Sequence, residues 1–435
     1  MPTPWLIIPG WAGNCGAANE DRIGKENEVR RRCWAALPLL VALILLASGR
    51  VGAMEKGIQD GWAVDNDDRV LLTAAVAREM RSAGARWVRL DFRLNARHKT
   101  WNEAILNAYA QVVANLQREH LAVLGLITNE AWPGAQTDWI ANNAEVAGGS
   151  GDNAYLRDLT GIAFRRLLRR FPSVRAWEIW NEPNAWTQNA PGRADKLPGG
   201  SYIYPSNFAW LLRRAFEESR ALPRPVTIVS GGVLAADFTD NLDSNLAAPY
   251  LRDTWRAGRT LGGWDRLRKQ YRCWPLDGWG LHLYLKTGSR IRPEEFTPYP
   301  VAFARLRDDL EGGPSRKTIW ITEIGWATPP GPGHLSEDDQ AANVTIALES
   351  LRRLPAIGPV LWFTLHDNPA ASLYYGLRRA DDTPKPAWAA FQAAIALTAI
   401  DLTPLTDHGP RGPASPYEGE GRLGLEGIAG SPSPR

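Results

Sequence analysis

Cysteine and histidine are scarce in this chain of 435 residues, and their scarcity excludes several kinds of site. Of the 3 cysteines, only Cys273 lies beyond an N-terminal segment that has the pattern of a targeting signal. A single thiol cannot form an internal disulfide and gives no sign of a metal cluster. The 6 histidines include no His-x-His pair at a strand end, so the ligand spacing of a metal-dependent hydrolase is missing. We therefore expect neither a metal nor another cofactor.

An excess of charge of one sign is also missing. The formal net charge is +3, and residues 1–53 hold six basic and four acidic residues, which leaves about +1 on the remainder. That remainder carries no footprint of binding to nucleic acid or to an anionic membrane surface. Hydrophobic residues at 44% and charged residues at 22% are instead typical of a soluble globular protein with an ample core. We expect a monomer.

A long uninterrupted apolar run is absent as well. The segment "VRRRCWAALPLLVALILLASGRVGA" has basic residues at Arg30–Arg32, an apolar run of 15 residues at Cys33–Ala47, and small residues before a possible cleavage after Ala53. The run contains Pro38 and is shorter than the roughly 20 residues of a spanning helix. We interpret it as a cleaved signal peptide, with an uncleaved membrane anchor or a structural helix as alternatives. Either targeting interpretation predicts export. Residues 1–28 do not fit the pattern, and we expect them to be disordered.

From about residue 55, short apolar runs alternate with longer helical patterns. The helical patterns include 67–84, which begins with acidic residues, and 336–355, with Ser336 and Asp339 at capping-box spacing. Eight runs have the character of buried strands, namely 56–59, 86–92, 121–128, 174–180, 225–231, 277–284, 317–323 and 359–366. This alternation predicts an α/β fold, a single (β/α)₈ barrel over residues 54–400, with a disordered Pro/Gly/Ser-rich tail over 401–435. A doubly wound open sheet is the alternative, but no glycine-rich phosphate loop marks its switch point.

Two carboxylates stand at the ends of predicted strands. In "AWEIWNEPN", strand alternation puts Glu178, Trp180 and Glu182 on one side, with Glu182 at the strand's end. Glu323 ends the strand "KTIWITE" in the same way. Such strand ends meet at the mouth of a barrel, where active sites are built. Two converging carboxylates are the parts that a glycosidase needs, because one donates a proton and the other attacks or stabilises the sugar carbon.

Tryptophan is abundant, with 20 residues, and it is present in two long connections. Residues 129–153 follow the third predicted strand and carry Trp132 and Trp139; residues 181–205 follow the fourth and carry Trp186. Indole rings are large flat surfaces that suit packing on partly apolar ligands. We expect a cleft that binds several units of an oligo- or polysaccharide, although packing beneath long loops explains these rings equally well.

The motifs "WNEPN", "HLY", "ITEIGW" and "LWF", in this order at strands four, six, seven and eight, resemble clan A of the glycoside hydrolases. Those are retaining enzymes on a (β/α)₈ barrel and include families 5 and 39, and the resemblance covers about residues 55–398. It implies a retaining O-glycosidase that hydrolyses β-glycosidic bonds through a glycosyl-enzyme intermediate. A catalytically inactive barrel that only binds glycans is the alternative, although Asn181, Glu182 and Glu323 are intact.

The resemblance also implies residue roles. Glu182 would be the acid/base and Glu323 the nucleophile, with Arg89 and Tyr284 as donors that keep Glu323 ionised. The remaining substrate-binding candidates are Asn181 at the sugar 2-hydroxyl, His282 at the nucleophile, Trp362 as a platform under the sugar, Trp186 and Trp326.

Each candidate also has a structural alternative. Glu178 is expected to be a buried partner of an arginine. His282 and Tyr284 could be satisfied polar groups of the core, Trp362 could be core packing, and Arg89 a core ion-pair partner.

Overall fold

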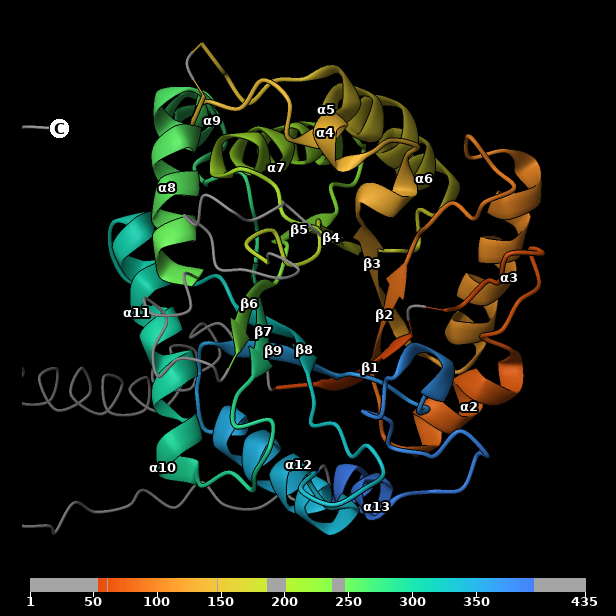
Figure 1. Cartoon of the computed structure of the whole chain (residues 1–435). Coiled ribbons are helices and arrows are strands. Elements are labelled where there is room, and N and C mark those ends of the chain that lie inside the picture. The colour runs from red at the N-terminus through yellow and green to blue at the C-terminus, as the bar shows by residue number, and fades with distance from the viewer. Residues whose placement is uncertain (1–53, 61, 147, 186–200, 237–246, 395–435) are drawn as a thin grey trace, which may run out of the picture. The chain divides into compact units, whose positions relative to one another are not determined.

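The computed structural model describes residues 54–60, 62–146, 148–185, 201–236 and 247–394 (Figure 1). The predicted signal peptide or anchor, Trp186 and the predicted tail lie outside these residues. Within the described ranges, no helix combines the length and apolar character needed to cross a membrane.

Nine parallel strands form one sheet, in the order β5-β4-β3-β2-β1-β9-β8-β7-β6. Their bounds are β1 Lys56–Asp60, β2 Trp87–Asp91, β3 Ala122–Ile127, β4 Ala176–Ile179, β5 Thr227–Ser230, β6 Val233–Ala236, β7 Trp279–Tyr284, β8 Ile319–Ile324 and β9 Ile357–Trp362. Eight of these match the eight predicted runs. The strand that the sequence pattern missed is β6, which is short and alanine-rich.

The two ends of this strand order meet near β5 and β6. β5 pairs with β4, and after the two glycines Gly231 and Gly232 the chain continues as β6 and pairs with β7. A parallel bridge joins Val229 of β5 to Gly278, which directly precedes β7. The strands, with helices between them, therefore make an α/β barrel, as predicted, with its fifth strand broken into β5 and β6.

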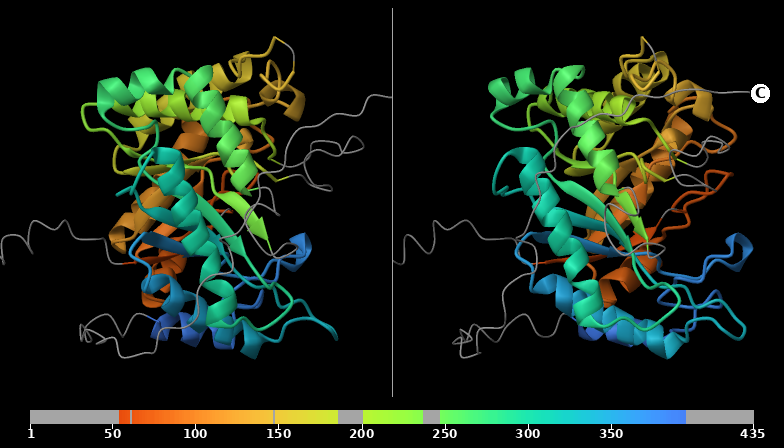
Figure 2. Two further views of the ribbon diagram at one scale, coloured as in Figure 1. Left: turned by 90° about the vertical axis from the view of Figure 1, so that its left-hand side faces the viewer. Right: turned by 60° about the vertical axis from the view of Figure 1, so that its left-hand side comes forward.

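Helices surround the strands in all three ribbon views (Figures 1 and 2). The α-helices are α2 Ala74–Ser82, α3 Glu103–Arg118, α4 Gln136–Trp139, α5 Ala154–Asp158, α6 Arg165–Arg170, α7 Pro205–Arg220, α8 Ala247–Thr260, α9 Trp264–Tyr271, α10 Pro293–Phe296, α11 Pro298–Glu311, α12 Glu337–Arg352 and α13 Pro386–Ala393. Three further elements are the 3₁₀ turns η1 Asn129–Ala131 and η3 Pro369–Ala371 and the π-helical stretch η2 Leu159–Phe164.

The predicted helix starts have different outcomes. α12 begins as expected, because the Asp339 amide donates to the Ser336 hydroxyl at 3.1 Å. The helix predicted over 67–84 is shorter than expected and begins only after Thr73, whose hydroxyl accepts from the Val76 amide. The acidic residues before it form a turn in which the Asp65 carboxylate accepts from backbone amides, a local alternative to helix that aspartate favours.

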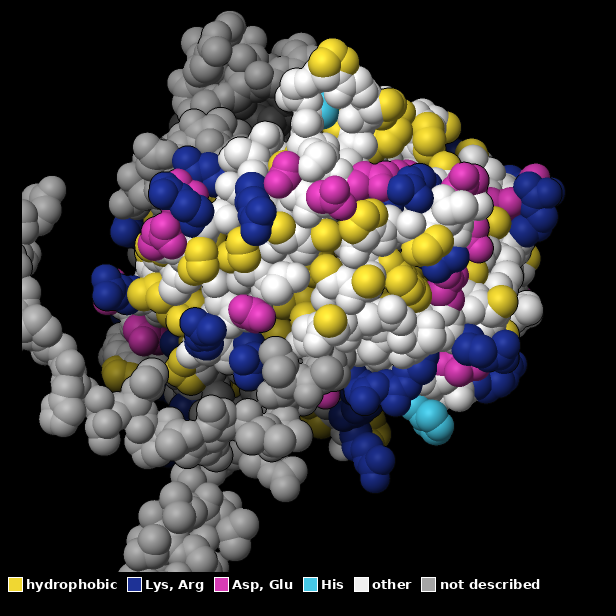
Figure 3. All heavy atoms as spheres, turned by 90° about the horizontal axis from the view of Figure 1, so that it is seen from below, with side chains coloured by type: hydrophobic (Ala, Val, Ile, Leu, Met, Phe, Trp, Pro, Cys, Tyr) yellow, Lys and Arg dark blue, Asp and Glu magenta, His cyan; other side chains and the backbone are white. Residues whose placement is uncertain are grey.

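The outer surface mixes charges of both signs. In the view from below, acidic and basic side chains are interspersed with apolar ones over the face that includes α12 and α13 (Figure 3). This mixture agrees with the small net charge of the chain, and it contrasts with the lining of the barrel mouth.

Candidate active site

A cavity of about 750 Å³ lies where the parallel strands end. In barrels of this kind the loops after the strands build the site. The lining residues come from strand ends and the segments that follow them: Gln59, Arg89, Asp91, Leu126, Thr128, Asn129, Glu130, Asn181, Glu182, Ser201, Leu234, Tyr284, Thr287, Glu323, Phe363, Leu373 and Tyr375.

Glu182 reaches this cavity through irregular backbone. β4 ends at Ile179, and both Trp180 and Glu182 have left-handed backbone, with φ of 77° and 43°. Residues other than glycine rarely adopt this conformation, and those that do gather at functional sites. The Trp180 ring packs edge-on against Trp139, with 5.9 Å between ring centroids. The strand alternation predicted for residues 178–182 therefore stops at Ile179.

Glu323 is held by the two donors that the sequence suggested. Arg89 Nη1 donates to Glu323 Oε1 at 2.6 Å, and the Tyr284 hydroxyl donates to Oε2 at 2.5 Å. Burial by itself would raise the pKa of Glu323, but the charges of His282 and Arg89 and hydrogen bonds from Tyr284 and Gln59 lower it below its usual range. Glu323 is therefore an ionised, almost fully buried carboxylate at neutral pH.

A register shift between β7 and β8 shapes this end of the site. Leu281 pairs with Ile321, whereas the next residue, His282, pairs with Glu323. The extra residue, Thr322, donates to the Glu178 carboxylate at 2.8 Å. Two successive residues of β8 therefore reach side chains of the same network, which regular alternation does not allow.

Arg89 connects the two buried carboxylates and the amide beside Glu182. Its Nε donates to Glu178 Oε2 at 2.5 Å, and its Nη2 donates to Asn181 Oδ1 at 2.8 Å. Glu178 is fully buried and also accepts from the Gly232 amide at 2.9 Å. The expectation that Glu178 is a structural partner of an arginine is confirmed. Through Arg89, this ion pair fixes the position of Glu323.

His282 lies between the two candidate catalytic carboxylates. Its Nδ1 is 3.0 Å from Glu182 Oε1 and 3.6 Å from Glu323 Oε2. Burial of the ring opposes protonation, but the negative charges of Glu323 and Glu182 outweigh it, and the pKa of His282 is raised above 6.5. A Cβ on residue 232 would come within 2.3 Å of this ring, so Gly232 gives the imidazole its space.

Tyr284 remains a donor throughout the physiological range. Burial and the adjacent Glu323 carboxylate raise its pKa well above 10, so the phenol keeps its proton. The candidates Arg89, Asn181, Glu182, Tyr284 and Glu323 thus all line one cavity.

The tryptophan candidates occupy different places. Trp362 and Trp326 are 1% and 0% exposed, and neither belongs to the cavity lining. Their indole groups donate to the backbone carbonyls of Tyr375 and Leu285, both at 2.9 Å. This placement corrects the interpretation of Trp362 as a sugar platform and of Trp326 as a substrate contact, because both rings are enclosed by protein.

Aromatic rings of other residues face the cavity instead. Phe363 and Tyr375 line it and pack on each other with 5.4 Å between ring centroids. Trp139 is buried, and its indole donates to the Tyr202 carbonyl at 3.1 Å, while Trp132 is partly buried against the core. Both described loop tryptophans therefore pack beneath the loops.

The sequence analysis missed four polar lining residues at the ends of the first three strands: Gln59, Asp91, Thr128 and Glu130. Asp91 could have been found, because it lies two residues after Arg89 and alternation puts both on one face. Glu130 gave no such signal, because it follows the strand in a 3₁₀ turn.

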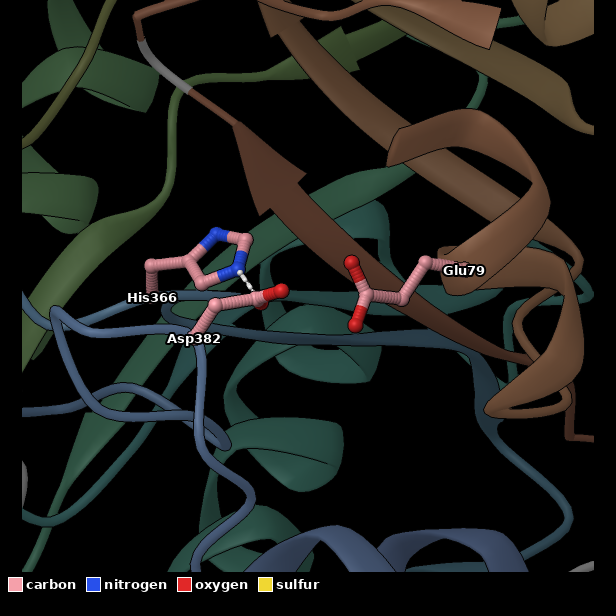
Figure 4. Close-up of side chains that lie close together, drawn as sticks. All are labelled: Glu79, His366 and Asp382. Carbon is pink, nitrogen blue, oxygen red and sulfur yellow. Dashed lines mark hydrogen bonds and ion pairs between the residues drawn. The ribbon is translucent and has the colours of Figure 1, made fainter. Parts of the chain in front are cut away.

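Two groups of side chains in the described ranges have the spacing of metal ligands. One is Glu182, His282 and Glu323, whose ligand atoms lie within 4.8 Å of one another. The other is Glu79, His366 and Asp382; Figure 4 shows His366 hydrogen-bonded to Asp382, with Glu79 across from them. Arg378 Nε lies 2.7 Å from Glu79 and 2.8 Å from Asp382, so a guanidinium already balances those carboxylates.

Comparison with known proteins shows which proteins have a similar fold. No protein-family model matches the chain, and no curated protein matches it. A family 39 glycoside hydrolase from Bacteroides cellulosilyticus WH2 is similar, with a TM-score of 0.52 and 17% identity over 80% of this chain. The fold is shared with glycoside hydrolases. This chain covers 64% of that enzyme, which is less than two thirds of its length.

Two GH5_18 structures are similar over more of their length. The one from Bifidobacterium longum subsp. infantis has a TM-score of 0.54 and 15% identity, over 79% of this chain and 78% of that one. An alanine variant from Streptomyces cattleya, in complex with Manβ1-4GlcNAc, has a TM-score of 0.51 and 18% identity, over 80% and 82% of the two chains. At this identity the likeness concerns the fold, and the function has to be argued from the site.

Proposed function

We propose that this protein is a retaining glycoside hydrolase that cleaves β-glycosidic bonds of an oligo- or polysaccharide. The observation that carries the proposal is the pairing of Glu182 and Glu323. An oxygen of each carboxylate lies within 4.8 Å of an oxygen of the other, at the mouth of the barrel. Retaining glycosidases keep their carboxyl groups about 5–5.5 Å apart, whereas inverting enzymes leave roughly 6.5–9.5 Å for a water molecule. The close pair favours retention.

The environments of the two carboxylates favour different roles. Glu323 accepts from Arg89 and Tyr284 and stays ionised, which suits a nucleophile. Glu182 has 23% of its side chain exposed and a hydrogen-bond partner in His282, whose imidazole can exchange protons with it. Glu182 is therefore assigned as the acid/base.

The reaction has two displacements. An oxygen of Glu323 attacks the anomeric carbon while the bond to the leaving oxygen breaks, and Glu182 transfers its proton to that oxygen. Water then attacks the same carbon, gives a proton to Glu182 as base, and releases Glu323. Arg89 and Tyr284 hold the nucleophile in place, and Asn181, beside Glu182, is positioned to contact a sugar hydroxyl. The β-linked disaccharide in the Streptomyces cattleya structure supports the choice of a β-linked substrate.

The stereochemistry of the product tests this function. We expect proton NMR of the first-formed sugar to show the β-anomer from aryl β-glycosides or polysaccharides. Glu182→Ala should slow substrates with poor leaving groups far more than activated aryl glycosides, because only the former need the proton. Activity that a chelator abolishes and a divalent ion restores would instead support a metal-dependent hydrolase, and inversion by the wild-type enzyme would overturn the retaining mechanism.

We further propose that the protein is exported, on the basis of the basic and apolar segment before Ala53. Fractionation of the source cells should find the barrel outside the cytoplasm, either secreted or attached to the membrane. Recovery from the cytosol with an intact N-terminus would contradict this.

A further inference from the structure

Two carboxylates that the mechanism does not use lie on another part of the cavity lining. Asp91 ends β2, and Glu130 lies in η1 after β3; we call this pair the acidic wall. The backbone brings them together, because the Phe92 amide donates to the Leu126 carbonyl at 3.0 Å and the Leu94 amide to the Glu130 carbonyl at 2.8 Å. The acidic wall is therefore built into paired strand ends.

The acidic wall has unfilled capacity to accept hydrogen bonds. Asp91 is 9% exposed, and its Oδ1 has no hydrogen-bond partner among the described residues. Glu130 is bound by Arg93, with Nη2 2.7 Å from Oε1. Burial and the charge of Glu130 raise the pKa of Asp91 to about 7. Asp91 Oδ1 itself is closed to solvent, whereas the Glu130 side chain is 42% exposed and has acceptor sites beyond the one that Arg93 fills, so a sugar donor can bind there.

Carboxylates outnumber cations in the lining of the cavity. Its carboxylates are Asp91, Glu130, Glu182 and Glu323, and its only lining cation in the described ranges is Arg89. Arg89 is already held by Glu323 and by the fully buried Glu178. A negatively charged group on the substrate would thus be repelled by these carboxylates and would find no free lining guanidinium in the described ranges to bind it.

We infer that the acidic wall is a specificity subsite for sugars that present hydroxyl or amino donors and carry no negative charge, and that it rejects uronic acids and sulfated sugars. This inference rests on the proposed function for the identity of the ligand as a sugar. A carboxylate that repels a like charge weakens the binding of the charged sugar, and this repulsion sets the difference between the affinities for the neutral and the charged sugar.

Matched ligands that differ at one position test the inference. The probes are 4-nitrophenyl β-glucoside with its β-glucuronide and 4-nitrophenyl β-galactoside with its β-galacturonide, each pair differing only at C6. Dissociation constants are measured by calorimetry on the full chain carrying Glu323→Gln, which removes the nucleophile and so prevents turnover of aryl glycosides. We expect the neutral member of at least one pair to bind tenfold or more tightly than the uronide.

The double variant Asp91→Asn/Glu130→Gln should reduce that ratio to within about threefold of one. A matched control, Asp253→Asn/Glu103→Gln, removes two carboxylates that lie outside the cavity and should leave the ratio unchanged. If the double variant does not fold, Glu130→Gln alone carries the test, because the Glu130 side chain is 42% exposed.

The outcomes separate this inference from the proposed function. Equal binding of both members of every pair, no binding of any probe, or a ratio that the double variant leaves unchanged would overturn the subsite. A wild-type enzyme that hydrolyses no glycoside, while its neutral-sugar preference depends on the acidic wall, would refute the hydrolase and keep the subsite. Hydrolysis with retention, but without a preference for neutral sugars, would support the hydrolase and refute the subsite.

Discussion

Two parts of one cavity treat buried carboxylates in opposite ways. On the side of β4, β7 and β8, Glu178 and Glu323 share the Arg89 guanidinium, and Thr322, Gly232 and Tyr284 donate to them. On the side of β2 and β3, Asp91 lies beside Glu130 and keeps an oxygen without a hydrogen-bond partner in the described part of the chain. The first arrangement fixes ionised groups in place, and the second leaves acceptor capacity for a ligand. The difference shows that local pairing, rather than burial alone, decides whether a buried carboxylate is held ionised or can accept hydrogen bonds from a ligand.

The largest effect is expected at the nucleophile. Glu323→Ala should lower kcat about 10⁴-fold or more, because the covalent step is lost while the cavity remains. Azide should restore activity and give product of inverted configuration, since a small anion fits the space left by the carboxylate. Steady-state kinetics and NMR of the product measure both. Activity within tenfold of the wild-type enzyme would show that Glu323 is not the nucleophile.

On the side of β4, β7 and β8, where the carboxylates are paired with Arg89, the stability of the fold should be sensitive to the loss of one charge. Glu178→Gln removes the partner of Arg89 Nε and should lower the free energy of unfolding by about 3 kcal/mol, because a buried guanidinium loses a counter-charge. Urea denaturation measures the change. The control Glu103→Gln breaks a pair with Arg166 in which both side chains are exposed, and it should cost about 1 kcal/mol or less. Equal losses in the two variants would remove the distinction between the network and a surface ion pair.

On the side of β2 and β3, removing the charge of Asp91 should instead raise the free energy of unfolding. Burial and the charge of Glu130 raise the pKa of Asp91 from 3.8 to about 7. Between these values the folded state binds more protons than the unfolded chain, so the contribution of Asp91 is most favourable in acid and is lost as the pH rises to 7. Asp91→Asn should therefore raise the free energy of unfolding at pH 8 by about 1–3 kcal/mol.

The same variant should change stability little at pH 4, where the Asp91 carboxyl is protonated in the folded state. Denaturation curves at pH 4, 6 and 8 provide the comparison. Destabilisation by Asp91→Asn at pH 8 would mean that hydrogen-bond or ionic partners stabilise the ionised Asp91 as well as they stabilise Glu178.

The smallest effect is expected from a single hydroxyl. Tyr284→Phe removes a donor that helps to lower the pKa of Glu323, so the acid limb of the kcat/KM profile should move to higher pH. Because a hydrogen bond to a charged group is lost, kcat/KM at neutral pH should fall about tenfold. An unchanged acid limb would show that Arg89 and His282 are enough to keep Glu323 ionised.

Much of the fold could be read from local pattern. Apolar runs alternating with helices predicted the barrel, because strands buried on both faces need continuous hydrophobic sequence. The missed strand, β6, has the sequence VLAA, too short and too small to stand out. The first acidic residues of 67–84 suggested a helix start, but Asp65 and Thr73 bind backbone amides locally and delay the helix to Ala74.

The sequence by itself determined which residues could do chemistry: Glu182 and Glu323 at strand ends, with Arg89, His282 and Tyr284 near them. Residue order along parallel strands is enough to bring Glu182 and Glu323 together, since the strands' carboxyl ends meet on one face, whereas Arg89, His282 and Tyr284 were implied by the resemblance to clan A. Only the tertiary structure decided how these groups are oriented. The left-handed turn at Trp180, the register shift in β8 and the pairing of Asp91 with Glu130 all depend on contacts between distant segments. The burial of Trp362 and Trp326 has the same cause, because a ring's neighbours, and not its place in a motif, decide whether a ligand can reach it.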